Sequence, residues 1–143
     1  MDDNTFIILC LMFIIFAVAF IFYIKWKRNK DVDKWLVENK YARKVYLETV
    51  VGVNSRIIQV QNVNGEKPKI KSLKGQNILY LNPGRNNIKL TCSCTRPDVL
   101  RKSVTTIYGP IEMDMDIEHY VDYKITFDKK SNKFIVREIR ENK

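Results

Sequence analysis

The sequence predicts an N-terminal transmembrane α-helix plus an all-β domain, an antiparallel β-sandwich of about seven or eight strands, with a short juxtamembrane helix between them. Three observations predict this class: a long apolar run near the N-terminus, period-two alternation of apolar and polar residues beyond it, and turn residues between the alternating segments. The predicted parts are residues 1–30, the anchor with its cationic flank, 31–43, the juxtamembrane helix, and 44–143, the β-sandwich domain.

The predicted anchor is the run from Phe6 to Ile24, which contains no charged residue. A helix of this length spans roughly 28 Å, about the thickness of one hydrocarbon core. Tyr23 and Trp26 lie at its end, where amphipathic rings favour the membrane interface. A cleaved signal peptide fits less well, because the segment before the run is acidic and the run continues beyond the small residues 17–19.

The charges that flank the run predict its orientation. Two acidic residues, Asp2 and Asp3, precede it, and four cations follow it, namely Lys25, Lys27, Arg28 and Lys30. Lysine and arginine close to a transmembrane helix stay on the cytoplasmic side. We therefore expect a single-pass membrane protein with its N-terminus outside and its C-terminal domain in the cytoplasm.

The segment after these cations has a helical pattern. Val32, Trp35 and Leu36 recur on one helical face, and Asp31 and Asp33 suit a helix start. This pattern predicts the juxtamembrane helix.

Period-two alternation predicts the strands of the β domain. They cover residues 45–51, 56–63, 67–71, 77–81, 87–95, 111–117, 120–128 and 132–139, and the segment 99–108 is ambiguous. Asn64-Gly65 predicts a tight hairpin turn, and Pro83-Gly84 predicts a type II turn. Gly109-Pro110 is expected to end the ambiguous segment. In 87–95, we expect Ile88, Leu90, Cys92 and Cys94 to share one face.

Two motifs in the segment from Ile57 to Leu90 carry a resemblance to a known class of domain. They read V-x-x-V-N-G-E-K and I-L-Y-L-N-P-G-R-N-N-I-K-L. The segment resembles the small β-sandwich accessory domains of the transthyretin-like and PEGA-like type, in which a strand ends in a Pro-Gly turn and the next strand leaves with alternating apolar residues. The resemblance covers about a third of the domain. It implies a non-catalytic binding or spacer domain and transfers no functional residues to this chain.

Composition favours anionic partners without choosing among them. The chain has 25 Lys and Arg against 16 Asp and Glu, a formal net charge of +9. Such an excess attracts lipid headgroups, nucleic acid or acidic proteins, and it also serves solubility alone. Of the three cysteines, Cys10 lies in the apolar run, which leaves Cys92 and Cys94 for the domain. This usage fits a reducing compartment better than a disulfide framework.

Residues with catalytic chemistry are sparse in this sequence. The one histidine, His119, lies at a predicted strand end, where a structural role is expected. Cys92 and Cys94 are interpreted as core residues, because a metal site needs further ligands. The aromatic residues lie mostly on core-facing positions, which argues against nucleic-acid binding. We expect no enzyme activity, no cofactor and no metal site.

A row of carboxylates is the most informative polar feature. Glu112, Asp114, Asp116 and Glu118 alternate with apolar residues, so in a strand they share the outward face. Lys67, Lys69 and Lys71 show the mirror pattern. These seven residues form the candidate interaction face. Either the two rows lie close together, or the acidic row meets a cationic partner; a solvated strand face with cross-strand lysines is the simplest alternative, and calcium binding the least suited to a flat strand.

The function expected from these patterns is a membrane-anchored, non-enzymatic β-sandwich module that mediates protein–protein interaction, as an accessory subunit of a membrane complex. The alternative is a membrane-surface binding or sensor module for anionic lipid or a small anionic ligand. The expected partners are the lipid bilayer and another protein. The oligomeric state stays open.

Overall fold

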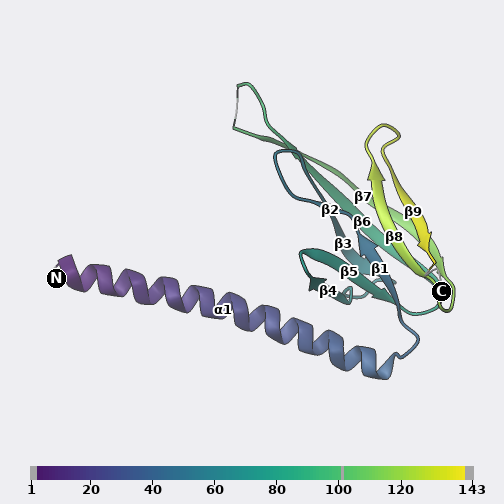
Figure 1. Ribbon diagram of the computed structural model, residues 1–143, viewed down its shortest axis with the longest axis horizontal. Helices are drawn as coiled ribbons and strands as arrows, with labels where there is room; N and C mark the ends of the chain where they lie inside the picture. The colour runs from purple at the N-terminus through teal and green to yellow at the C-terminus, as the bar shows by residue number, and fades with distance from the viewer. Residues whose placement is uncertain (1–2, 101, 141–143) are drawn as a thin grey trace. The chain divides into compact units, whose positions relative to one another are not determined.

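The structure, a computed structural model, describes residues 3–100 and 102–140 (Figure 1). The chain divides into two compact units, Met1–Glu38 and Asn39–Lys143. The first is a single helix and the second is a β domain, and each is described by itself below.

Helix α1 runs from Asp3 to Glu38 without a break. The anchor segment and the first part of the predicted juxtamembrane segment therefore lie in one continuous helix. The stretch Asn4–Glu38 contains an apolar segment long enough to cross a membrane, and no residue of that segment's most apolar 18-residue window is buried. Near the end of the apolar run, the rings of Tyr23 and Trp26 lie 6.4 Å apart, and Lys30 Nζ lies 5.0 Å from the Trp26 ring centroid. This pairing of aromatic rings and a cation is typical of a membrane interface.

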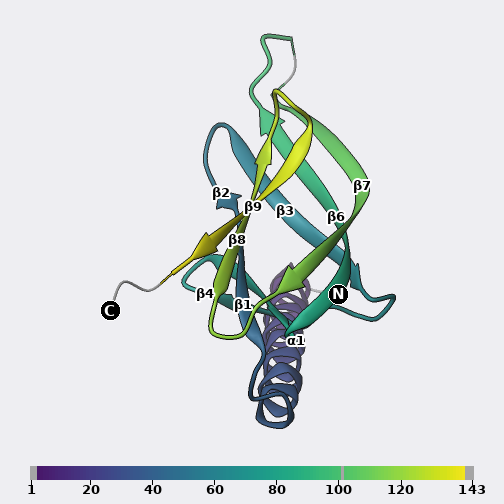
Figure 2. The ribbon, with the colours of Figure 1, turned by 90° about the vertical axis from the view of Figure 1, so that its right-hand side faces the viewer.

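The β domain is built from two sheets. Its strands are β1 (Arg43–Leu47), β2 (Thr49–Val50), β3 (Ser55–Val63), β4 (Ile70–Leu73), β5 (Gln76–Leu81), β6 (Gly84–Arg96), β7 (Val104–Ile117), β8 (Asp122–Asp128) and β9 (Lys133–Ile139). The five-stranded sheet has the order β4-β5-β1-β8-β9, and the four-stranded sheet has the order β2-β3-β6-β7, of which β3, β6 and β7 are seen side by side in Figure 2. The strand pairs are antiparallel except β1 with β8, which is parallel, so the expectation of a purely antiparallel domain is wrong at this pair.

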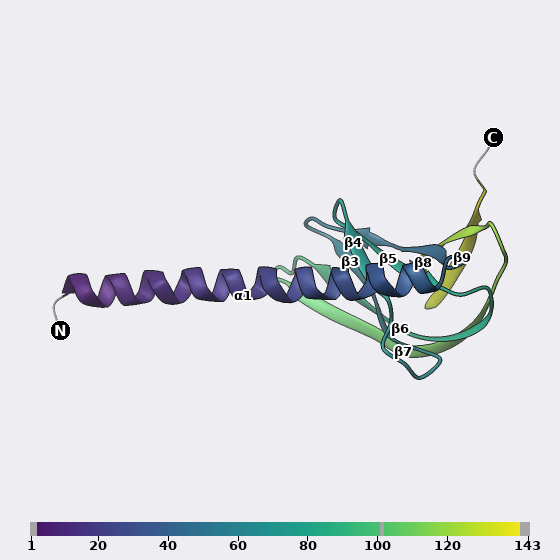
Figure 3. The ribbon, with the colours of Figure 1, turned by 90° about the horizontal axis from the view of Figure 1, so that it is seen from below.

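The two sheets share one apolar core. The five-stranded sheet contributes Val45, Leu47, Leu79, Leu81, Tyr123, Ile125 and Phe127, and the four-stranded sheet contributes Ile58, Val60, Ile88, Leu90, Cys92, Met115 and Ile117. Figure 3 shows β6 and β7 on the opposite side of the domain from β5 and β8. The predicted inward set of the strand 87–95 is confirmed for Ile88, Leu90 and Cys92, which are fully buried.

The chain changes sheets at Glu48, where a single strand over 45–51 was expected. That prediction is wrong: β1 ends at Leu47 in one sheet, and β2 starts at Thr49 in the other. The Glu48 N–H donates to the Ile125 carbonyl at 3.0 Å, and the Glu48 carbonyl accepts from the Ile58 N–H at 3.3 Å. The backbone of one residue is therefore bonded to both sheets.

Strand β7 runs through Gly109 and Pro110, so the expected break at this dipeptide is wrong. Leu90 of β6 faces Ile111 and Cys92 faces Tyr108, so Gly109 and Pro110 together oppose one residue. This is a β-bulge, and the extra residue shifts the alternation of the strand. Tyr108 consequently packs 5.0 Å from Phe127, ring to ring, while Ile107 is 69% exposed.

The predicted turn at Asn64-Gly65 is confirmed, but the strand that follows it joins the other sheet. Both turn residues have positive φ, 52° for Asn64 and 79° for Gly65. Val63 and Glu66 exchange backbone hydrogen bonds of 2.9 Å across the turn. The next strand, β4, begins only at Ile70 and lies at an edge of the five-stranded sheet.

Candidate functional site

The acidic row lies on and just after β7. Glu112, Asp114 and Asp116 are exposed, while Met115 and Ile117 between and after them are buried, and Glu118 follows the strand end. Because β7 is the last strand in its sheet order, this row borders an edge of the four-stranded sheet.

The cations that meet the acidic row come from β6. Lys89 Nζ lies 3.4 Å from Glu112 Oε1, and Arg85 forms an ion pair with Asp114. Asn87 Nδ2 also donates to Asp114 Oδ1 at 2.8 Å. The hydrogen bond from Arg85 is the main cause of a lowered pKa of Asp114, and the Asp114 carboxylate raises the pKa of Arg85 in turn. These pairs are solvent-exposed, so they offset repulsion within the row and add little stability.

The lysine row lies elsewhere. Lys71 belongs to β4, at an edge of the five-stranded sheet, and Lys67 and Lys69 precede that strand. The structure therefore places the two charged rows in different sheets. Arg85 was missed as a partner of the acidic row, although its position one residue after the Pro83-Gly84 turn puts it at the start of a strand.

A second surface, which the sequence reading missed, is the three-loop end. We use this name for the β2–β3 connection, the described residues of the β6–β7 connection and the β8–β9 turn, which lie at the same end of the β domain (the upper end in Figures 1 and 2). Its loops expose large apolar side chains: Val51 (82%), Val53 (75%), Val99 (100%) and Leu100 (93%). In the sequence, the adjacent apolar residues Val99 and Leu100 follow the turn residues Arg96-Pro97-Asp98, and this arrangement could have indicated an exposed apolar loop.

A pocket of about 230 Å³ lies at the three-loop end. Its described lining residues come from the four-stranded sheet, the β2–β3 connection and the β8–β9 turn, and are Val50, Asn54, Ser55, Arg56, Cys94, Thr95, Arg96, Thr106 and Lys129. Three of these residues are cations, Arg56, Arg96 and Lys129, and the described lining contains no carboxylate. Such a lining suits an anion.

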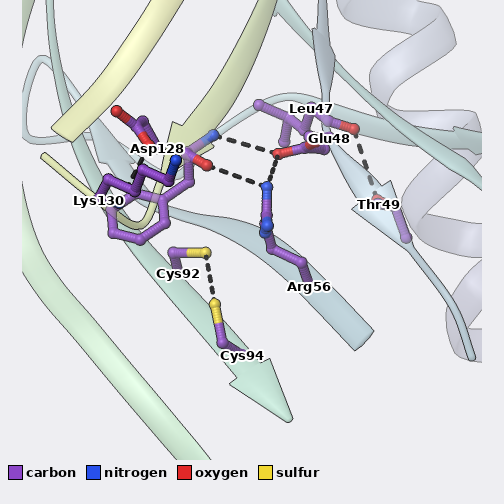
Figure 4. Close-up of polar contacts among 9 residues, drawn as sticks. Leu47, Glu48, Thr49, Arg56, Cys92, Cys94, Asp128 and Lys130 are labelled. Carbon is purple, nitrogen blue, oxygen red and sulfur yellow. Dashed lines mark hydrogen bonds and ion pairs between the residues drawn. The ribbon is translucent and has the colours of Figure 1, made fainter. Parts of the chain in front are cut away.

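Arg56 is held beside this pocket by bonds to the other sheet (Figure 4). Its Nη1 donates to the Phe127 carbonyl at 3.0 Å and to Glu48 Oε2 at 3.3 Å. The same carboxylate oxygen accepts from the Phe127 N–H at 3.2 Å. Burial alone would lower the pKa of Arg56, but the charge of Glu48 and its hydrogen bond raise it overall. The guanidinium is therefore fixed between β3 and β8 and stays charged.

Cys92 and Cys94 lie on the same face of β6 (Figure 4), with their Sγ atoms 3.8 Å apart. Both are free thiols. Burial, followed by the hydrogen bond with Cys94, raises the pKa of Cys92 to about 12. Cys92 is therefore a protonated core residue at neutral pH. Within residues 3–100 and 102–140, no three His, Cys, Asp or Glu side chains are grouped to hold a metal ion.

The raised pKa of Cys92 predicts a loss of stability in alkali. The protonated Cys92 thiol contributes to the free energy of unfolding. This contribution is fully present below the pKa of about 9 in the unfolded chain, and it is lost as the pH rises toward the pKa of about 12 in the folded protein. At about pH 10.5, this loss is roughly 2 kcal/mol in the free energy of unfolding. Urea unfolding of the detergent-solubilised full chain, at about pH 8 and about pH 10.5, measures it. The variant Cys92→Ala has no thiol to ionise at this position, so it should lose less stability between the two pH values. Equal losses of unfolding free energy in the variant and the native chain would show that Cys92 is not the cause.

Fold and surfaces together define the class: a β domain of two sheets that follows one helix long and apolar enough to span a membrane. No family model, curated protein or solved structure matches the chain.

Proposed function

We propose that the chain is a single-pass membrane protein whose β domain is a β-sandwich that binds another protein, as a non-enzymatic accessory subunit of a membrane complex. The exposed apolar window of α1 supports retention as an anchor, because such a surface needs lipid around it. The cations from Lys25 to Lys30 favour a cytoplasmic β domain. The single core shared by the two sheets supports the sandwich.

The observation that carries this proposal is the edge strand β7 with its acidic row. β6 occupies one side of β7, and the regular half of the strand, from Ile111 to Ile117, offers backbone N–H and C=O groups on its other side. A partner strand can add to such an edge through main-chain hydrogen bonds. Basic side chains of that strand would meet Asp116 and Glu118. Arg85 of β6 lies opposite Asp116 in the register but forms its ion pair with Asp114, and Glu118 lies beyond the end of β7.

The negative charge of the acidic row indicates what kind of partner can bind there. Two copies of β7 laid edge to edge would bring acidic rows side by side, and like charges across strands repel. The bulge at Gly109 and Pro110 also limits regular pairing to the second half of the strand. The edge is therefore better suited to a basic strand of a different protein. The resemblance to transthyretin-like and PEGA-like accessory domains implies the same kind of non-catalytic role.

Site-specific photo-cross-linking in native membranes tests this proposal. A photoreactive residue at Asp116 should form one discrete cross-linked product, whereas the same residue at Lys124, an exposed position on β8 in the other sheet, should not. With the photoreactive residue kept at position 116, the double variant Asp114→Asn/Glu118→Gln should reduce the product at least about tenfold, because it removes the remaining neighbouring charges of the row that recruit the partner.

The matched control is Asp98→Asn/Glu66→Gln, which removes the same number of carboxylates from exposed positions outside the row. It should leave the cross-linked product unchanged. Equal loss in both double variants, or no discrete product at position 116, would refute the proposed edge.

A further inference from the structure

The loops of the three-loop end present apolar side chains that the described residues of the β domain leave uncovered. Val99 and Leu100 are adjacent on the β6–β7 connection and are 100% and 93% exposed, and Val51 and Val53 are nearly as exposed on the β2–β3 connection. Exposed apolar residues normally occur singly on a soluble surface, so two pairs at one end indicate contact with an apolar phase or partner.

Cations surround these apolar tips. The strands and connections at this end carry Arg56, Arg96, Lys102, Lys129, Lys130 and Lys133, against the carboxylates Glu48, Asp98 and Asp128, of which Glu48 is paired with Arg56. Asp128 is already engaged, because it accepts hydrogen bonds from the Lys130 N–H at 3.0 Å and from Ser131 Oγ at 2.7 Å. The three-loop end is therefore both apolar at its tips and positive behind them.

The pocket behind the tips has the size and lining for one phosphate-bearing headgroup. It measures about 230 Å³, and Arg56, Arg96 and Lys129 reach it from β3, β6 and the β8–β9 turn. Ser55 and Thr106, two residues whose side chains carry hydroxyl groups, also line it. Arg56 is pre-positioned there by Glu48 and the Phe127 carbonyl, so it need not be ordered when a ligand binds.

We infer that the three-loop end docks on the anionic leaflet of a lipid bilayer, with Val51, Val53, Val99 and Leu100 entering the interface and the Arg56–Arg96–Lys129 pocket holding a lipid phosphate. Apolar residues at the ends of separate loops suit a soft phase that closes around each tip. A ring of cations behind apolar residues is the arrangement that membrane-surface segments use. The inference rests on the proposed anchorage by α1, which keeps the domain beside lipid, and does not depend on the proposed partner of β7.

Quenching of single tryptophans by brominated lipids tests the inference on the full chain in nanodiscs. The variant Trp26→Phe/Trp35→Phe/Leu100→Trp should be quenched and blue-shifted in nanodiscs that contain brominated phosphatidylserine, but not in those of brominated phosphatidylcholine alone. Reversing two pocket charges, Arg96→Glu/Lys129→Glu, should abolish the quenching. The equal reversal Lys67→Glu/Lys69→Glu, outside the three-loop end, should leave it intact.

Two further tryptophans separate the possible outcomes. The variant Trp35→Phe, which keeps Trp26 at the end of the apolar run, reports anchorage by α1 alone. The variant Trp26→Phe/Trp35→Phe/Leu73→Trp places the probe on β4, a control that should stay unquenched. Quenching at position 26 without quenching at position 100 would refute the lipid site at the three-loop end and would still support anchorage by α1. The absence of quenching at position 26 would refute that anchorage. Quenching at position 100 that is equal in both lipids would refute the anionic pocket.

Discussion

Replacement of Gly109 by alanine is expected to lower the free energy of unfolding by about 3 kcal/mol. Gly109 lies in the bulge of β7 with φ of +98°, a conformation that residues with a side chain rarely adopt. A Cβ at this position would lie 2.8 Å from the Leu90 carbonyl oxygen and 3.0 Å from the Ile111 nitrogen. Both are backbone atoms of paired strands, so they have little freedom to move. Urea unfolding of the detergent-solubilised full chain measures the effect.

Gly75→Ala is the matched control for this experiment. Gly75 also has a positive φ, +77°, but a Cβ there would meet no atom within 4 Å. Its cost is therefore conformational alone, about 1 kcal/mol. If the two variants lost equal stability, the close approach of β6 to the bulge would not be the cause.

Glu48→Ala should cost about 2 kcal/mol in the free energy of unfolding. The change removes the carboxylate that accepts from the Phe127 N–H and from Arg56, and it leaves that N–H without its partner inside the domain. Glu48 is also the residue where the chain passes from one sheet to the other, so the loss falls on a link between them. The same urea titration at neutral pH measures it.

Glu48→Gln separates the hydrogen bond from the charge. A glutamine oxygen can still accept from the Phe127 N–H, while the charge that holds Arg56 is gone. We expect a loss of about 1 kcal/mol, between the native chain and Glu48→Ala. If the glutamine variant were as unstable as the alanine variant, the charge of Glu48 would be the main contribution and the hydrogen bond a minor one.

Local chemistry was enough to predict the apolar helix, the turn at Asn64-Gly65 and the inward residues of β6. Each depends on neighbours in the sequence: a helix long enough for a bilayer, two positive φ angles, and a strict alternation. The outward placement of Glu112, Asp114 and Asp116 followed from the same alternation.

Non-local pairing decided the rest. Alternation continues unbroken through Glu48, so nothing in 45–51 marks the change of sheet. Gly-Pro signals a break and a bulge equally, and only the register of β6 against β7 distinguishes them. In the sequence, the apolar residues of the three-loop end look the same as core residues. Their exposure depends on which strands cover the loops, and only the folded structure shows that. The pocket cations were missed for the same reason: Arg56, Arg96 and Lys129 are far apart in the chain.

The parallel pairing of β1 with β8 has a consequence for the synthesis of this protein. β1 is the middle strand of its sheet, between β5 and β8, and Val45 faces Leu79 on one side and Tyr123 on the other. A chain leaving the ribosome presents its first strand long before β8 exists, and such long-range contacts make folding slow. Until then, β1 carries an open apolar edge that can pair with other chains. Chains that terminate before Asp122 would therefore be prone to aggregate, and the domain can complete its fold only after nearly all of it has been translated.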